Sequence, residues 1–488
     1  MWFSRFFNAS GPKRAPLYFY NTLTRSKDLF TLPPRAKEVR MYNCGPTVYG
    51  RQHIGNLSMF VFTDILRKTL EYNGHTVKQV INFTDFGHLT SDADEGDDKM
   101  MTGLKREGLT LTLENMRAFG EKYANLFLED VRALNIEVDH ITFPRASDYI
   151  PAQVALIRTL EEKGYTYTAK NGVYFDTSKF PDYGKLGAID LAGLKEGARV
   201  KVSPDKRNPT DFLLWKSSKK IGWDSPWGNG FPGWHIECSA MINATLGKQI
   251  DIHTGGIEHI PVHHNNEIAQ SESATGKKPL ARFWLHRAHL QLEGAKIAKS
   301  EGNVVYLSDV IERGFHPLSL RYLLLGAHYR TPANFTWAAL EGAQTAYKRL
   351  CMIRTDFNDA IGGASDPAFS RVFRERINDD LDTAGALAAL WDVLKDESVS
   401  RESKLASILE ADKLLGLRLD EPETLKVFAV SYVRVEDAPP EIRIMLEKRE
   451  EARAAHDFAK ADALRDQVQN AGYDIEDTPE GPHILKKG

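Results

Sequence analysis

A histidine and a glutamate stand four residues apart at His263 and Glu267, and two isolated cysteines, Cys44 and Cys238, precede them. On a helix, residues four apart leave the same face, so both side chains can reach one metal ion. Thiols, imidazoles and carboxylates are zinc ligands, but structural zinc sites usually draw their cysteines from close pairs. Ligands spread over more than two hundred residues predict a site that the tertiary fold assembles and that binds a substrate.

Each of these residues also has a simpler explanation. A lone cysteine is usually a small buried hydrophobe, and a His–Glu pair on a helix is usually an ion pair. Glycine, proline or aromatic residues close to all three segments favour a site instead. The adjacent His264 could replace His263, although the spacing of four favours His263. There is no HExxH motif, and the pair His235 and Glu237 lacks the PCxxC of a zinc deaminase.

The composition is that of a globular protein. At 488 residues with 42% hydrophobic residues, the chain is long enough for two to four domains. Because 63 Lys and Arg stand against 66 Asp and Glu, any nucleic-acid contact must use local patches. Three cysteines argue for a reducing compartment, with Cys351 expected in the core. No apolar stretch reaches the ~18 residues of a membrane span.

The basic start of the chain, MWFSRFFNASGPKR, is too short in its apolar part for a signal peptide. It is compatible with an organellar presequence, but a frayed tail explains it more simply. We therefore expect a cytoplasmic protein without membrane attachment.

The order of elements predicts an α/β fold. Residues 39–49 read as a strand that runs into a loop, 57–72 as a helix with Gly74 as its stop signal, and 77–83 as a buried strand. This is a βαβ unit with a parallel crossover. Residues 150–232, with a hairpin at 165–175, interrupt the pattern as an insertion, after which the α/β pattern returns.

From residue 317 onward the strand signals fade, and helices are predicted at 318–327, at 337–353 and on to about 415. Loops at 362–367 and 437–440 are the linker candidates. A terminal amphipathic helix is expected from Phe458, Ala461, Leu464, Val468 and Ala471, with Gly472 ending it. The expected division is a catalytic domain at 1–316, a helical connector at 317–356, a helical bundle at 357–437 and a small module at 438–488.

Two segments could handle a nucleotide. The tetrapeptide HIGN, which begins at His53, lies where a loop enters the first predicted helix, so backbone N–H groups face a ligand above it. Gly55 lets phosphate approach the backbone, and His53 and Asn56 can donate hydrogen bonds to it. Lys296 and Lys299 lie three apart in a glycine-bounded loop and could clamp a leaving pyrophosphate. Alone, that loop reads as a solvated basic segment.

Together, these segments resemble the class I aminoacyl-tRNA synthetases and, among them, the cysteinyl-tRNA synthetases. HIGN resembles the HIGH motif of the class, and KIAKS resembles its KMSKS loop. The resemblance continues through MYNCGPTVY, PGWHIECSAM, HHNNEIAQS, the stretch KIAKSEGN and DFAKADALRD, and so spans nearly the whole chain. It implies a Rossmann-type parallel-sheet catalytic domain with an insertion, an all-helical bundle that binds tRNA and its anticodon, and a small C-terminal module.

The resemblance also implies roles for single residues, carried over by position. One Zn²⁺ would be bound by Cys44, Cys238, His263 and Glu267. ATP, with Mg²⁺, would be bound by Pro46, His53, Gly55, Asn56, Lys296 and Lys299, and four of these, His53, Asn56, Lys296 and Lys299, would be catalytic. Thr84, Trp234 and, less directly, His253 would line the amino-acid pocket.

The motifs depart from the family in two places. Asn56 stands where the HIGH motif has its second histidine, which keeps a donor but loses a titratable ring. Ile297 and Ala298 stand where the KMSKS loop has Met and Ser, which removes a hydroxyl. Both lysines and Ser300 are retained, so we expect activity with an altered affinity for ATP.

The activity implied is a cysteine–tRNA ligase that forms cysteinyl-adenylate, releases pyrophosphate and charges the 3′ end of tRNA(Cys). Zinc would bind the substrate thiolate, a contact that serine cannot match, whereas apolar pockets separate near-isosteres by only about 1–3 kcal/mol. No editing domain is then needed, and a monomer is expected. Two alternatives stand beside this reading, a ligase that joins cysteine to an amino sugar in mycothiol synthesis and a silent RNA-binding paralogue.

Overall fold

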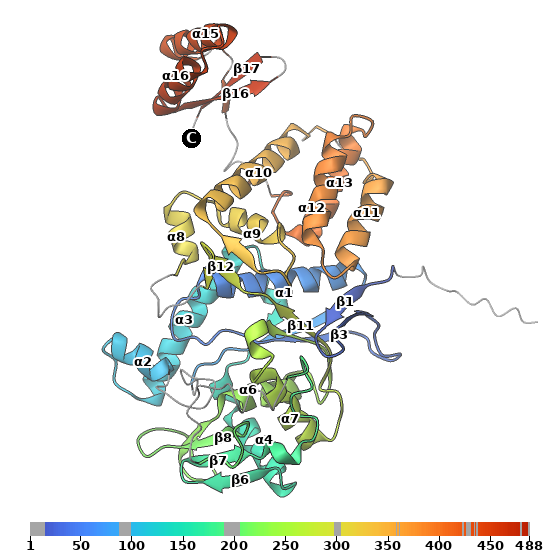
Figure 1. Ribbon diagram of the computed structural model, residues 1–488, viewed down its shortest axis with the longest axis vertical. Coiled ribbons are helices and arrows are strands. Elements are labelled where there is room, and N and C mark those ends of the chain that lie inside the picture. Colours follow the sequence, from blue (N-terminus) through green and yellow to red (C-terminus); the bar gives the residue numbers. More distant parts are fainter. Residues whose placement is uncertain are drawn as a thin grey trace, which may run out of the picture. The chain divides into compact units, whose positions relative to one another are not determined.

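The computed structural model describes residues 15–86, 99–189, 205–296, 304–357, 359–360, 362–421, 424–425, 431–433, 435, 438–478 and 481–486. Residue contacts divide the chain into two units. One is Met1–Tyr347 with Gly362–Leu417, and the other is Lys348–Ile361 with Arg418–Gly488. The first unit holds the large sheet and most of the helices (Figure 1).

The centre of the first unit is a five-stranded sheet in which all neighbouring strands are parallel. In spatial order, its strands are β11 (Ala281–Arg287), β10 (Ile250–Gly256), β3 (Val39–Asn43), β4 (Val77–Ile81) and β5 (Ile141–Thr142). The chain lays β4 and β5 on one side of β3 and later returns to place β10 and β11 on the other. The strand order therefore reverses between β3 and β10, which is where open α/β sheets bind ligands.

Helices cover both faces of this sheet because its strands are apolar on both. Val80 and Ile81, successive residues of β4, point to opposite faces and join different hydrophobic clusters. The first cluster includes residues of α6 (Trp234–Thr245) and α7 (His263–Thr275), and the second includes residues of α1 (Ile54–Tyr72) and α3 (Leu113–Ala133). The predicted α/β architecture is thus confirmed.

Helix α1 connects β3 to β4 and carries the HIGN segment at its start. His53 is its N-cap, and the imidazole Nδ1 accepts a hydrogen bond from the Asn56 backbone N–H at 3.2 Å. Gly74 follows the helix with φ of 78°, the left-handed conformation in which glycine commonly ends helices. Both ends of this helix therefore lie close to the places that the sequence predicts.

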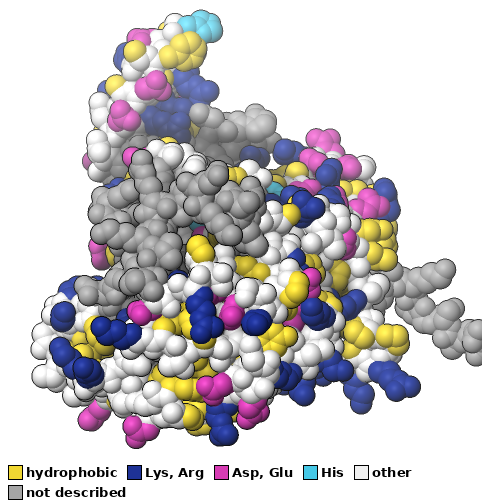
Figure 2. All heavy atoms as spheres, turned by 60° about the horizontal axis from the view of Figure 1, so that its bottom comes forward, with side chains coloured by type: hydrophobic (Ala, Val, Ile, Leu, Met, Phe, Trp, Pro, Cys, Tyr) yellow, Lys and Arg dark blue, Asp and Glu magenta, His cyan; other side chains and the backbone are white. Residues whose placement is uncertain are grey.

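The region at 150–232 adds a helix and a second sheet to the first unit. Its four strands are antiparallel neighbours, and the predicted hairpin forms the first two of them. The elements are α4 (Ile150–Glu162), β6 (Thr166–Ala169), β7 (Gly172–Phe175), β8 (Phe212–Ser217) and β9 (Gly230–Pro232). Figure 2 brings this end of the unit forward and shows basic and acidic side chains interspersed on its surface.

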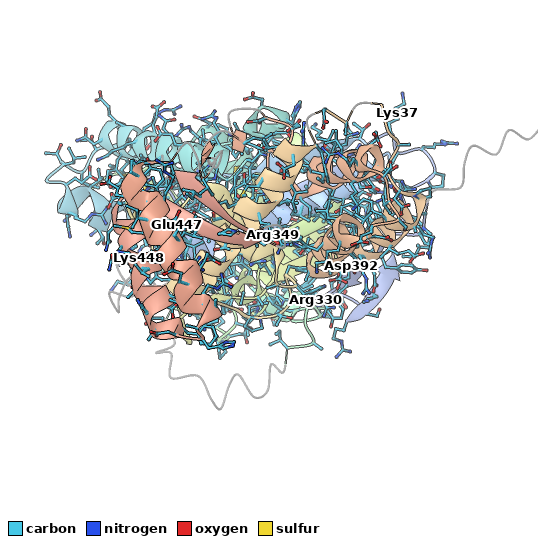
Figure 3. The ribbon with its side chains drawn as sticks, turned by 90° about the horizontal axis from the view of Figure 1, so that it is seen from above. Lys37, Arg330, Arg349, Asp392, Glu447 and Lys448 are labelled. Atoms are coloured by element: carbon cyan, nitrogen blue, oxygen red, sulfur yellow. The ribbon has the colours of Figure 1, made fainter. Side chains whose placement is uncertain are left out.

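Helices dominate the chain from residue 317 onward, as predicted, and one helix that the sequence analysis did not predict comes just before them. These helices are α8 (Leu307–Glu312), α9 (Pro317–Leu325), α10 (Trp337–Asp356), α11 (Pro367–Asn378), α12 (Thr383–Lys395) and α13 (Arg401–Leu415). A short strand that the sequence did not indicate, β14 (Ala333–Phe335), pairs in parallel with β12 (Leu290–Leu292). Between α11 and α12, Asp380 forms an ion pair with Arg330, which is labelled in Figure 3; Arg330 Nη2 lies 2.7 Å from Asp380 Oδ2.

A buried ionic cluster ties α1 to these helices. Arg321 of α9 and Asp64 of α1 are fully buried, and Arg321 Nη2 lies 2.6 Å from Asp64 Oδ2. The guanidinium also donates to the carbonyl oxygens of Leu415, from Nε at 2.6 Å, and of Leu134, from Nη1 at 2.9 Å. The helix that begins with HIGN is therefore anchored both to α3 and to the end of α13.

The second unit is a small α/β module with its own core. Its elements are β15 (Ser431–Val433), α15 (Pro440–Ala454), α16 (Phe458–Asn470), β16 (Tyr473–Thr478) and β17 (Gly481–Lys486), with the strands antiparallel in the order β15-β17-β16. Glu447 and Lys448 lie on α15 (Figure 3). The predicted terminal helix is confirmed, with Leu464 and Val468 buried. The assignment of Phe458 and Ala471 to its apolar face is wrong, since Phe458 is 61% exposed and Ala471, the C-cap, is also exposed.

Candidate metal and nucleotide site

The four proposed zinc ligands meet at the switch point of the central sheet. Cys44 directly follows β3, Cys238 lies in α6, and His263 and Glu267 lie in α7. All four are buried, and one donor atom from each lies within 4.8 Å of the others. The helical spacing of four brings His263 Nε2 to 3.0 Å from Glu267 Oε1. Two thiols, an imidazole and a carboxylate from three separate elements fit the donor set that zinc prefers.

A second combination of donors overlaps the first. Cys44 and Glu267 also group with His253 and His264, again within 4.8 Å. His264 Nε2 lies 3.3 Å from Cys44 Sγ, while His253 Nε2 lies 2.8 Å from Glu267 Oε2. This set leaves out Cys238, the donor on α6. Both adjacent histidines thus remain geometrically possible ligands, and the set with His263 has the second thiol.

The second ring nitrogen of each of the two adjacent histidines, His263 and His264, has a partner that fixes the ring. His263 Nδ1 lies 2.9 Å from His235 Nδ1, and His264 Nδ1 lies 2.8 Å from His286 Nε2. His286 continues the chain of contacts to the Thr22 hydroxyl at 2.7 Å. Metal-binding histidines characteristically have such outer partners, which orient the ring.

Close packing of these groups changes their proton affinities. The hydrogen bond from Cys44 lowers the pKa of Cys238 to about 6, although burial raises it. Burial lowers the pKa of His263, but Glu267 and Cys238 together outweigh burial and the net pKa is about 10. Burial raises the pKa of Glu267, but the charges of His253 and His263 hold it below its ordinary value. A proton on His263 thus offsets buried negative charge, a task that a divalent cation performs with more charge.

One cavity of about 330 Å³ joins three of these donors, Cys44, Cys238 and His263, to the HIGN segment. Thr84 and Trp234 line it, and the Trp234 ring centroid lies 4.2 Å from that of His263. The predicted pocket residue His253 is fully buried behind Glu267 and stacks on Trp284, with 4.5 Å between the ring centroids. Thr84 and Trp234 can therefore meet a ligand directly, whereas His253 reaches it through Glu267.

The predicted nucleotide residues line the same cavity where the structure describes them. Pro46, His53, Gly55 and Asn56 form part of its wall. The Asn56 side chain donates to Gln52 Oε1 at 2.7 Å. Lys296 ends β13 (Ala295–Lys296), a strand whose side chains are not described, and Lys299 lies outside the described residues.

Two residues of the site were missed by the sequence analysis. Asn82 Oδ1 accepts the Gly45 backbone N–H at 2.9 Å and lies 3.8 Å from Cys238 Sγ. Glu237 Oε2 accepts a hydrogen bond from the Thr84 hydroxyl at 2.8 Å. Both residues stand within two positions of predicted site residues, which was the available signal. Their contacts position the pocket wall next to the donor cluster.

The doubly wound parallel sheet, the helix that begins with HIGN and the cavity at the switch point define a class I aminoacyl-tRNA synthetase. The model of the class I (C) tRNA synthetase catalytic domain matches residues 31–345. A Mycobacterium tuberculosis methionyl-tRNA synthetase in complex with methionyl-adenylate has a similar fold, with a TM-score of 0.54 and 15% identity over 80% of this chain and 93% of that chain. At this identity the likeness concerns the fold alone.

Within that class, the chain belongs to the cysteinyl-tRNA synthetase family. The model of the cysteinyl-tRNA ligase anticodon binding domain matches residues 435–484. Cysteine–tRNA ligase 1 of Burkholderia lata is 45% identical over 476 residues, 96% of this chain and 97% of the relative. The Thermus thermophilus cysteine–tRNA ligase is 41% identical over 488 residues, covering 96% and 98%. An amino-sugar ligase would resemble only the catalytic part, so the terminal match argues against that alternative.

None of the described helices is both long and apolar enough to cross a membrane.

Proposed function

We propose that this chain activates cysteine with ATP and transfers it to tRNA(Cys), with Zn²⁺ bound by Cys44, Cys238, His263 and Glu267. The observation that carries this proposal is the convergence of Cys44, Cys238 and His263 with the start of α1 on one cavity, with Glu267 buried in the same donor cluster. When bound, Zn²⁺ would offer the substrate thiolate a bond that a serine hydroxyl cannot match. The amino acid would thus be selected before it is activated.

The chain's own residues would hold cysteine beside this metal. Trp234 covers His263, and Thr84 presents its hydroxyl at the cavity wall while donating to Glu237. His253 would act on the pocket through Glu267, whose carboxylate it contacts. These contacts support a pocket whose walls are fixed before the substrate arrives, which lowers the cost of orienting it.

ATP, with Mg²⁺, would lie at the start of α1. Gly55 and the backbone N–H groups of the first turn suit phosphate, while His53 and Asn56 would donate to its oxygens. Pro46 shares that cavity wall. The carboxylate of cysteine would attack the α-phosphate in line, with Lys296 and Lys299 neutralising the departing pyrophosphate. The terminal ribose hydroxyl of the tRNA would then attack the activated carbonyl and release AMP.

The helical regions would place the tRNA. We assign acceptor-stem contacts to residues 317–356, and tRNA and anticodon contacts to the bundle at 357–437 together with the module at 438–488. The match of the anticodon-binding model to residues 435–484 supports the last assignment. We propose that the active species is a monomer, which light scattering at assay concentration tests.

The experiment that tests the proposed activity compares acceptors. The protein is incubated with ATP, Mg²⁺ and labelled cysteine, and with either tRNA(Cys) or a glucosamine-based acceptor. We expect cysteine on the tRNA and none on the sugar. Transfer to the sugar, or no transfer to tRNA(Cys) by zinc-replete protein, would refute the proposal.

A further inference from the structure

Arg287, the last residue of β11, is a buried cation that has no partner of opposite charge within the described part of the chain. Arg287 is only 6% exposed to solvent. Among the residues that the structure describes, its hydrogen bond is from Nε to the Ser58 hydroxyl of α1, at 3.0 Å, and no carboxylate forms an ion pair with it. Burying an unpaired charge is costly, so proteins rarely retain one without a counter-charge. The counter-charge of Arg287 is therefore to be sought in a ligand.

A second arginine on β11, Arg282, shows how the protein neutralises an arginine that has a structural role. Arg282 of β11 pairs with Asp251 at 3.3 Å and donates to the Thr31 carbonyl at 2.6 Å. Its guanidinium is thus neutralised and bonded by the protein itself. Arg287 lacks that neutralisation although it is buried more deeply.

The guanidinium lies on the cavity that the proposed nucleotide residues share. Arg287 lines this cavity together with His53 and Asn56, and Ser58 anchors it to the first turns of α1. An arginine has five N–H donors, and the hydrogen bond to Ser58 uses the one on Nε. Burial lowers the pKa of Arg287 to about 10, so it stays charged at neutral pH.

The other charged residues that line this cavity add little negative charge that would repel an anion. Glu258 is the only carboxylate among the described residues that line it, and it lies 3.6 Å from His289 Nδ1. No acidic residue lies in the first turn of α1, whose positive end favours negative charge. The surroundings of Arg287 therefore favour a polyanion, for which a planar array of donors is well suited.

We infer that Arg287 binds the triphosphate of ATP and restores, beside Asn56, a positive charge that the HIGN motif lacks. The inference rests on the proposed ATP-dependent activation of cysteine. Ser58 acts as a positioning residue, because its hydroxyl holds Nε and leaves the remaining donors for phosphate oxygens.

The test measures the binding of ATP, AMP and adenosine by calorimetry to the zinc-replete full chain. Arg287→Met should weaken ATP binding about 10- to 100-fold, the range for loss of hydrogen bonds to a charged group, and leave adenosine unchanged. Arg287→Lys should give a smaller loss, since it keeps the charge but not the planar donors. Ser58→Ala, which keeps the arginine, should weaken ATP a few-fold. Arg282→Met is the matched control and should bind ATP like the wild type.

Equal weakening of ATP and adenosine in Arg287→Met and Arg287→Lys would mean that the arginine only supports the fold, and would overturn the inference. Unchanged ATP binding in both variants would also overturn it. Cysteine-dependent pyrophosphate exchange by the wild type is measured in parallel. Since ATP binding is read directly, a wild type that binds ATP but does not exchange would count against the proposed function and not against Arg287.

Discussion

Replacing Arg321 by methionine should destabilise the first unit by about 3–5 kcal/mol, the range for breaking a buried ion pair by removing one partner. The substitution removes the guanidinium nitrogen Nη2 that lies 2.6 Å from Asp64 Oδ2. It also leaves the carbonyl oxygens of Leu415 and Leu134 without donors at 2.6 and 2.9 Å. Since the unit spans 403 residues, and the unfolding entropy is about 2.1 cal/mol/K per residue, the melting temperature should fall by about 4–6 °C.

The same pair should give this difference a pH dependence. Burial raises the pKa of Asp64, but the charges of Arg321, Lys68 and Arg67 together outweigh burial, and the net pKa lies below the ordinary value. A carboxyl with a lowered pKa stabilises the fold above its unfolded pKa of about 3.9 and loses that contribution as the pH falls through its folded pKa. The stability gap between wild type and Arg321→Met should therefore narrow in acid.

Differential scanning calorimetry between pH 7 and about pH 3, a range that extends below the unfolded pKa of Asp64, measures both effects. Arg371→Met is the control, because Arg371 is 67% exposed and its ion pair with Glu375 spans 3.6 Å. Such exposed pairs contribute at most about 1 kcal/mol. A loss in Arg321→Met no larger than in the control, or a gap that does not narrow in acid, would refute the role given to this cluster.

Cys238→Ser should lose bound zinc, while the control Cys351→Ser, whose cysteine is buried in α10, should keep it. Atomic absorption on the purified proteins measures the zinc content, and full zinc in Cys238→Ser would exclude Cys238 as a ligand. Thr84→Val, which deletes the hydroxyl bonded to Glu237, should raise the KM for cysteine about 3- to 10-fold in pyrophosphate exchange, as for loss of one hydrogen bond. Lys299→Ala should lower kcat in the same assay about 10²- to 10³-fold, and an unchanged kcat would argue against a clamp. Removal of residues 431–488 should abolish tRNA charging but leave exchange intact, and equal loss of both would show that the module supports the catalytic fold.

Local spacing made part of the site predictable. Two residues four apart on a helix must share a face, so the pairing of His263 and Glu267 followed from geometry alone. The two cysteines were candidates from their residue type, the family resemblance implied the full set of four ligands, and the fold brings all four together. Strand geometry gave no comparable guide for His253, because the sequence does not say which face of β10 its side chain takes. In the structure it lies behind Glu267.

Features that depend on distant partners could not be predicted. Strand β14 exists because it pairs with β12, about forty residues earlier in the chain, and three residues carry no strand period of their own. Phe458 fits an apolar helix stripe, but no core reaches it at the first turn of α16. Arg287 belongs to no motif, and its importance appears only when burial and the lack of a described carboxylate partner are known.

The most direct measurement is ATP–pyrophosphate exchange with cysteine or serine, on protein of known zinc content, before and after chelation. A zinc-thiolate contact should give exchange that requires cysteine, that serine does not support, and that chelation abolishes and added Zn²⁺ restores. Exchange that proceeds equally with serine, or that persists in protein without zinc, would contradict the selection of cysteine by a metal at Cys44, Cys238, His263 and Glu267.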